Sequence, residues 1–115
     1  LMFTGTIQVE FTNSDLSVKI TYWENLYLDY ADIDSVEIRK EFQTGYRTYG
    51  YSSAVISAGI YENEEFGQYT LCKEKGAQSY LILHTQRGVI VIADGDENTS
   101  GLLYEKIKSY NKTKK

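Results

Sequence analysis

Apolar and polar residues alternate with a period of two along the first part of the chain. Residues 7–11 and residues 16–20 each place an apolar side chain at every second position, with Gln, Glu, Ser or Lys between them. A strand with one buried face and one face in water has this alternation. Residues 13–15, Asn-Ser-Asp, lie between the two segments and are types that hydrogen-bond to their own backbone in turns. The pattern therefore predicts a β-hairpin.

Shorter segments of the same kind continue the β pattern to residue 92. They predict strands at residues 26–28, 36–38, 59–61, 69–72, 80–85 and 89–92, with the last two joined as a hairpin. The last strand, Val-Ile-Val-Ile, is apolar at every position, so we expect it to be covered on both faces. Residues 40–53 hold glycines among tyrosines and predict either a long tyrosine-rich loop or two ragged strands.

The period changes near the end of the chain. Leu103, Ile107 and Tyr110 recur at the spacing of one face of an α-helix. Residues 98–100, Asn-Thr-Ser, are good N-cap types and stand just before this stripe. We expect a helix over about residues 99–111 that packs its apolar stripe on the sheet.

Composition agrees with one folded domain that covers residues 1–115. The 115 residues are 42% hydrophobic and 14% aromatic with no proline, which is a globular composition. Cys72 is the only cysteine, which excludes an intrachain disulfide framework and a multi-cysteine metal site. No apolar run approaches the ~20 residues of a transmembrane helix.

Charge is distributed unevenly along the chain. Residues 101–115 carry five lysines against one glutamate, a net charge of +4, and include a basic tail at residues 112–115. Residues 1–100 carry seven basic and fifteen acidic side chains, a net charge of −8. An acidic body argues against nucleic-acid binding, which needs many cations facing phosphates. The basic end suits an anionic membrane surface or an acidic partner, or else it complements the dipole of a solvated helix end.

The order of short strands followed by one helix resembles the bacterial pleckstrin-homology-like (PH-like) domains. The resemblance spans about residues 16–110. The segments that carry it are residues 16–20, 26–28 and 32–36 at the start, 59–61 and 66–71 in the middle, and 81–85, 89–92 and 102–107 at the end.

The resemblance implies a mainly β fold. Such a fold is a barrel of seven to eight antiparallel strands in two orthogonal sheets, capped by one C-terminal helix. Family members often follow transmembrane segments. The chain begins with Leu1 and not with methionine, so we expect a fragment or a processed form of a protein, on the cytoplasmic face of a bacterial membrane if transmembrane segments precede it. Phosphoinositide-binding relatives cluster Lys and Arg at the first hairpin, whereas residues 11–16 hold no cation here.

One turn carries a spacing known from calcium loops. Asp94, Asp96, Asn98 and Glu105 match the first, third, fifth and twelfth places of an EF-hand loop. The glycine that the sixth place requires is Thr99, and a strand precedes the loop instead of a helix. The favoured interpretation is a polar turn that leads into a capped helix, so we predict no metal and no cofactor.

Two further side chains are candidates for chemistry. His84 is the only histidine, and a general base needs a nucleophile or an orienting carboxylate nearby. The strand alternation places His84 on one face with Tyr80 and Ile82 and favours a structural role. Cys72 lies within a strand, which favours a buried, unreactive thiol.

Tyrosines in the middle of the chain are candidates for an interface. Tyrosine offers rigid contact area with a polar tip, but it is also a good strand former, so contact and packing both remain open. The candidate contact residues are Tyr46, Arg47, Tyr49, Tyr51, Lys106 and Lys108.

These patterns favour a non-catalytic PH-like interaction module that binds a protein partner, or itself, near a membrane. Exposed edge strands of such a fold are able to pair with a partner. The alternative is a small-ligand-binding or enzymatic β-barrel that uses Cys72 with His84, or the acidic turn at residues 94–98.

Overall fold

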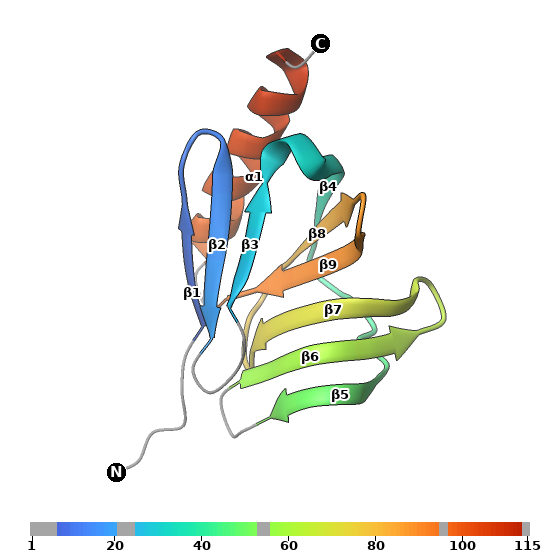
Figure 1. Ribbon diagram of the computed structural model, residues 1–115. Helices are drawn as coiled ribbons and strands as arrows, with labels where there is room; N and C mark the ends of the chain where they lie inside the picture. Colours follow the sequence, from blue (N-terminus) through green and yellow to red (C-terminus); the bar gives the residue numbers. More distant parts are fainter. Residues whose placement is uncertain (1–6, 21–24, 53–55, 95–96, 114–115) are drawn as a thin grey trace.

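The computed structural model describes residues 7–20, 25–52, 56–94 and 97–113 (Figure 1). These residues form nine strands in two sheets, one short 3-10 turn and one C-terminal helix. The smaller sheet has the order β1-β2-β3 and the larger has the order β4-β8-β9-β7-β6-β5. The elements are β1 (Ile7–Phe11), β2 (Asp15–Ile20), β3 (Leu26–Asp29), η1 (Tyr30–Asp32), β4 (Ile33–Arg39), β5 (Tyr46–Ser52), β6 (Ile56–Asn63), β7 (Gly67–Glu74), β8 (Tyr80–Thr85), β9 (Gly88–Ala93) and α1 (Glu97–Thr113).

The first predicted hairpin is confirmed. β1 and β2 pair antiparallel, and Leu16, Val18 and Ile20 of β2 are buried as the alternation requires. The turn is held by the Thr12 hydroxyl oxygen, which accepts hydrogen bonds from the backbone N–H groups of Ser14 and Asp15, both at 3.1 Å.

The expected antiparallel barrel is wrong in three respects. The described residues form nine strands, β7 and β9 pair in parallel, and the two sheets do not close into a barrel. The physical reason is that the β8–β9 hairpin lies between β4 and β7, so that β9 runs beside β7 in the same direction. Alternation specifies which face of a strand is buried, but it does not specify which strand lies beside it.

Residues 40–53 contain strand β5 and, before it, a segment that crosses the larger sheet. β5 pairs antiparallel with β6, so half of this region is regular sheet. β4 and β5 lie at opposite edges of the larger sheet although they follow each other in sequence. Residues 40–45, the crossing segment, must therefore pass over that sheet.

Two apolar clusters lie on the two faces of the larger sheet. The inner cluster fills the space between this sheet, the smaller sheet and α1, and it includes Val18, Leu83 and Ile107, all 0% exposed. The outer cluster gathers on the opposite face, which we call the outer face, around Tyr69 and Ile82. β9 contributes to both clusters, so the prediction that this strand is covered on both faces is confirmed.

The C-terminal helix is confirmed with two more residues at each end than expected. α1 lies against β4 and η1, where Leu103 and Ile107 are buried and the ring centre of Tyr110 lies 5.7 Å from that of Tyr30. Its later turns extend beyond the sheets (Figure 1). Within the described residues, no helix is both long enough and apolar enough to span a bilayer.

Candidate functional site: an outer face and its open edge strand

The crossing segment is attached to the outer face by its aromatic side chain. Phe42 lies across the outer cluster, with its ring centre 5.4 Å from that of Tyr80 and 5.7 Å from that of Tyr69. The Tyr69 hydroxyl donates a hydrogen bond of 2.7 Å to the Thr44 carbonyl. Burial raises the pKa of Tyr69, so this hydroxyl keeps its proton and its role as a donor.

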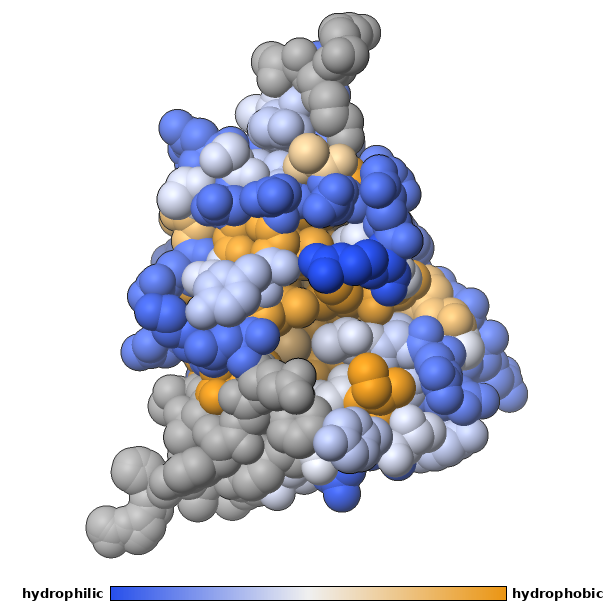
Figure 2. Space-filling view, in the orientation of Figure 1, coloured by the Kyte–Doolittle hydropathy of each residue, from blue (hydrophilic) through white to orange (hydrophobic). Residues whose placement is uncertain are grey.

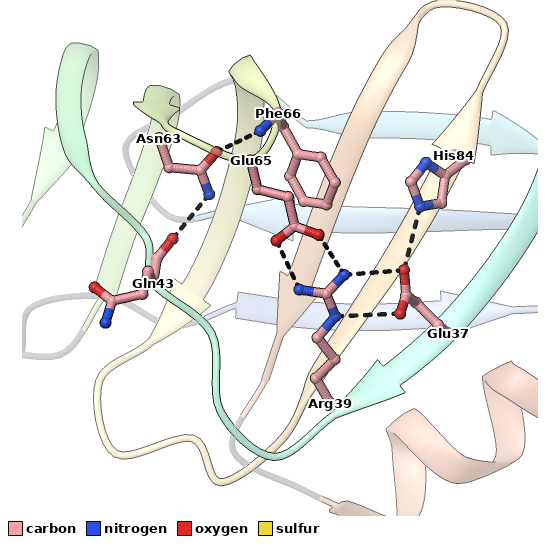
Figure 3. A network of polar contacts seen from close by, with 7 residues as sticks. All are labelled: Glu37, Arg39, Gln43, Asn63, Glu65, Phe66 and His84. Carbon is pink, nitrogen blue, oxygen red and sulfur yellow. Dashed lines mark hydrogen bonds and ion pairs between the residues drawn. The ribbon is translucent and has the colours of Figure 1, made fainter.

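A charged network lies beside this aromatic cluster (Figure 3). The Arg39 guanidinium donates two hydrogen bonds of 2.7 Å to the two carboxylate oxygens of Glu65. It also donates to Glu37, at 3.1 Å from Nε and 3.2 Å from Nη2. These hydrogen bonds from Arg39 are the main reason that the pKa values of Glu37 and Glu65 lie below their usual range. The network ties the end of β4 to the turn between β6 and β7.

His84 also belongs to this network. Its Nε2 lies 3.3 Å from a carboxylate oxygen of Glu37, and its ring packs edge-on against Phe66 at 5.7 Å between centres. Among the described residues, Glu37 supplies a carboxylate beside the imidazole, but neither Glu37 nor Phe66 is a hydroxyl or thiol that His84 would activate as a base. The sequence prediction that His84 shares a face with Tyr80 and Ile82 is confirmed, because all three lie at the outer face.

Cys72 lies on the other side of the sheet. It is buried in the inner cluster, and in the sheet it is paired with Ala58 and Ile92. Burial raises the pKa of the thiol to about 12, so it remains protonated. Cys72 and His84 are therefore separated by the sheet itself, and the structure does not bring them together for catalysis.

Within the described residues, the side chains of the candidate calcium loop are not gathered around one point. Asp94 is half-buried, whereas Asn98 and Glu105 are exposed on α1. Asp96 lies outside the described residues. Among the residues that the structure describes, no group of three or more His, Cys, Asp or Glu side chains is arranged to hold a metal ion.

The tyrosine candidates gather on β5, an edge strand. The side chains of Tyr46 and Tyr49 are 60% and 65% exposed, and Arg47 between them is exposed. Tyr51 belongs to the same strand, but its side chain lies outside the described residues. Sequence reasoning found these residues but missed that they form the last strand of a six-stranded sheet.

The lysine candidates form a separate surface. Lys106 and Lys108 are exposed on α1, where Lys106 donates a hydrogen bond to the Asn13 side chain and the Lys108 ammonium lies 5.8 Å from the ring centre of Tyr104. Figure 1 places the end of α1 and strand β5 at opposite ends of the molecule. The structure therefore divides the predicted contact residues between two surfaces.

The edge strands β1, β3 and β4 each make a contact outside their own sheet. The backbone N–H of Ile7 in β1 donates to the Glu74 carboxylate at 3.2 Å, and α1 packs on β4. β3 has four residues, and its Tyr27 carbonyl accepts a hydrogen bond of 3.4 Å from Arg87. This last contact spans the gap between the sheets, where hydrophobic side chains reach the surface between β3 and β9 (Figure 2). β5 pairs only with β6, and no other described strand lies along its outer side, which we call its open side.

A groove of about 1020 Å³ adjoins the open strand. It lies between the crossing segment and the β6–β7 turn, and it reaches Gly45 and Tyr46 at the start of β5. Its acidic lining consists of Glu41, Glu62, Glu64 and Glu65. Sequence reasoning missed this groove because its walls come from segments that are about twenty residues apart in the chain.

Comparisons with known proteins identify no relative. No family model, no curated protein and no solved structure matches the chain. Function is therefore inferred from the residues and surfaces described above.

Proposed function

We propose that this domain is a non-catalytic, PH-like interaction module that binds an extended segment of a partner protein along the open side of β5. The observation that carries the proposal is an edge strand of seven residues with two largely exposed tyrosines, Tyr46 and Tyr49. An added strand obtains its affinity from backbone hydrogen bonds to the edge, and its specificity from side-chain contacts.

The sequence of β5 supports strand addition. Natural edge strands avoid pairing by being short, by carrying several charges, by containing proline or by a β-bulge. β5 has seven residues, no proline and one charged residue, Arg47, so the bulge is the one such feature that it has. A register shift between Arg47 and Tyr49 interrupts the strand, and such a bulge restricts which segments can pair with it.

Tyrosine side chains suit the contact surface. An aromatic ring that becomes buried at an interface contributes contact area at a low cost in conformational entropy, and tyrosine is common among residues that dominate binding energy. Tyr46 and Tyr49 flank the bulge, so a segment along β5 would bury both.

The PH-like assignment is supported by the order of strands followed by one helix, and by the packing of that helix on the sheets. The parallel β7–β9 pair departs from the expected antiparallel order. The proposed interaction depends on the β5 surface and does not depend on the PH-like assignment.

Selection from a random peptide library tests the proposal. We expect peptides that bind the wild-type domain to bind the Tyr46→Ser/Tyr49→Ser variant at least about 10-fold more weakly, because two interface aromatics are lost. The Tyr27→Ser variant is the matched control, since Tyr27 is 64% exposed on another edge strand.

Hydrogen exchange of the complex identifies the edge that is used. Strand addition predicts new protection of β5 backbone amides when a selected peptide is bound. Equal loss of binding in the Tyr27→Ser variant, or protection confined to other strands, would contradict the proposal.

A second candidate function is contact with an anionic membrane surface through the end of α1. Lys106, Lys108 and Lys112 are exposed there, and each lysine near such a surface contributes about 1 kcal/mol. Such contact would fit a domain on the cytoplasmic face of a membrane, where anionic lipids attract basic segments.

Co-sedimentation with vesicles tests the membrane contact. We expect binding to phosphatidylcholine vesicles that contain phosphatidylserine, no binding without it, and loss of binding in the Lys108→Gln/Lys112→Gln variant. Vesicle binding that is unchanged in this variant would show that the helix end is not the contact.

A further inference from the structure

We infer that the segment bound along β5 is basic, that is, an extended peptide of another protein that carries Lys or Arg side chains. This inference rests on the proposed function, because the site is the open strand and the neighbouring charges select what binds there.

The first step is the continuity of the edge with the groove. Gly45 and Tyr46 line the groove, where Tyr46 is the first residue of β5 and Gly45 directly precedes it. A peptide that runs along β5 therefore passes directly from the strand edge into the groove, where its next side chains meet the groove wall.

The second step is the charge of that wall. Arg39 already donates to both Glu37 and Glu65, so its charge is compensated within the network. Glu41, Glu62 and Glu64 make no ion pair within the described residues, and Glu41 and Glu64 are exposed. Lys40 and Arg47 are sequence neighbours of residues that line the groove, and the three carboxylates without an ion pair outnumber them.

The third step is the way in which the outer face already binds a cation of this chain, the Arg39 guanidinium. The Arg39 guanidinium lies 5.8 Å from the ring centres of both Phe42 and Phe66 while it is paired with carboxylates. Carboxylates beside aromatic rings stabilise a cation by charge and by cation–π attraction. Tyr46, which is 60% exposed and is one of the residues that line the groove, offers another aromatic ring for an incoming Lys or Arg.

The charge of the whole domain acts in the same direction. The whole chain has a net charge of −4, with −8 in residues 1–100, and such a field raises the association rate of a cationic segment and disfavours an anionic one. This contribution weakens as salt is added, since exposed charges are screened over about 10 Å at 0.1 M salt.

Three synthetic peptides of one length test the inference. They alternate Thr with Lys, Thr with Gln, or Thr with Glu, and their binding is followed by chemical shifts of β5 amides in the full chain. We expect the Lys peptide to bind most tightly, the Glu peptide most weakly, and added NaCl to reduce the difference.

Variants of the groove locate the effect. We expect Glu62→Gln/Glu64→Gln to weaken the Lys peptide by about 3- to 10-fold and to leave the Gln peptide unchanged, as the loss of two exposed ion pairs predicts. The Asp34→Asn/Glu105→Gln variant is the matched control, because it removes two exposed carboxylates outside the groove and should bind like the wild type.

The outcomes separate this inference from the proposed function. Equal affinity of the three peptides at β5 overturns the preference for a basic segment and leaves strand addition intact. Absence of any shift at β5 with every peptide overturns both. Salt-sensitive self-association that is lost in Glu62→Gln/Glu64→Gln and in Lys108→Gln/Lys112→Gln would identify a second copy of this chain as the occupant, and would overturn the inference of another protein.

Discussion

Gly50 and Gly59 face each other across the β5–β6 pair and allow the two backbones to approach closely. Their φ angles are +151° and +140°, and an added Cβ would lie 2.2 Å from the Ala58 carbonyl oxygen or the Tyr49 carbonyl oxygen, respectively. The neighbouring atoms are backbone, so they cannot move aside as a flexible side chain would. These two glycines therefore shape the strand that carries the exposed tyrosines.

Substitution of one of these glycines tests this role. We expect Gly59→Ala to lower the free energy of unfolding by about 1–3 kcal/mol, because the backbone must shift and the φ angle is strained. Gly101→Ala is the control with the opposite sign. It lies in α1 with open space around its Cα, so it should stabilise the domain by about 0.5–1 kcal/mol. Urea denaturation measures both, and a neutral Gly59→Ala variant would contradict the role of the pair.

At the scale of the elements, the Arg39 network joins parts that are far apart in the chain. Glu37 and Arg39 belong to β4, His84 belongs to β8, and Glu65 belongs to the β6–β7 turn. The network thereby supports the crossing segment and one wall of the groove. Because the pKa values of both glutamates are lowered in the folded state, folding stability depends on their ionisation.

Acid therefore should weaken this connection. The stabilisation is present above the usual glutamate pKa of 4.5 and is lost as pH falls through the lowered pKa values of the folded state. We expect Glu65→Gln to lower the urea midpoint at neutral pH, and we expect its difference from the wild type to shrink toward zero in acid. Glu105→Gln, a control on the exposed face of α1, should show no such trend. A difference that is constant with pH would contradict the role of the ion pair.

At the scale of the whole molecule, the larger sheet separates the inner apolar cluster from the outer apolar cluster. Its middle strands contribute to both clusters, whereas β5 lies at the edge and exposes most of its side chains. Regions with few buried apolar contacts open at lower free energy than the core. The binding edge should therefore be the least protected strand of this sheet.

Native-state hydrogen exchange tests this order. We expect amides of β8 and β9 to exchange only on global unfolding, and amides of β5 to exchange through a smaller opening at low urea. Equal opening free energies across the sheet would contradict the view that the edge strand opens independently of the core.

Local patterns in the sequence determined eight of the nine described strands, the C-terminal helix and the faces that are buried, whereas β5 stayed open between a loop and ragged strands. Alternation identified the buried side chains of β2 and both covered faces of β9, and the helical spacing identified Leu103, Ile107 and Tyr110, because each of these patterns depends only on near neighbours in the chain. The exposed tyrosines at residues 46 and 49 were also recognisable as candidate contacts. The order of strands, the parallel β7–β9 pair and the open side of β5 were decided by tertiary structure alone, because strand neighbours are selected by long-range packing. The Arg39 network was likewise invisible in sequence, since 26 residues separate Arg39 from Glu65 and 47 separate Glu37 from His84.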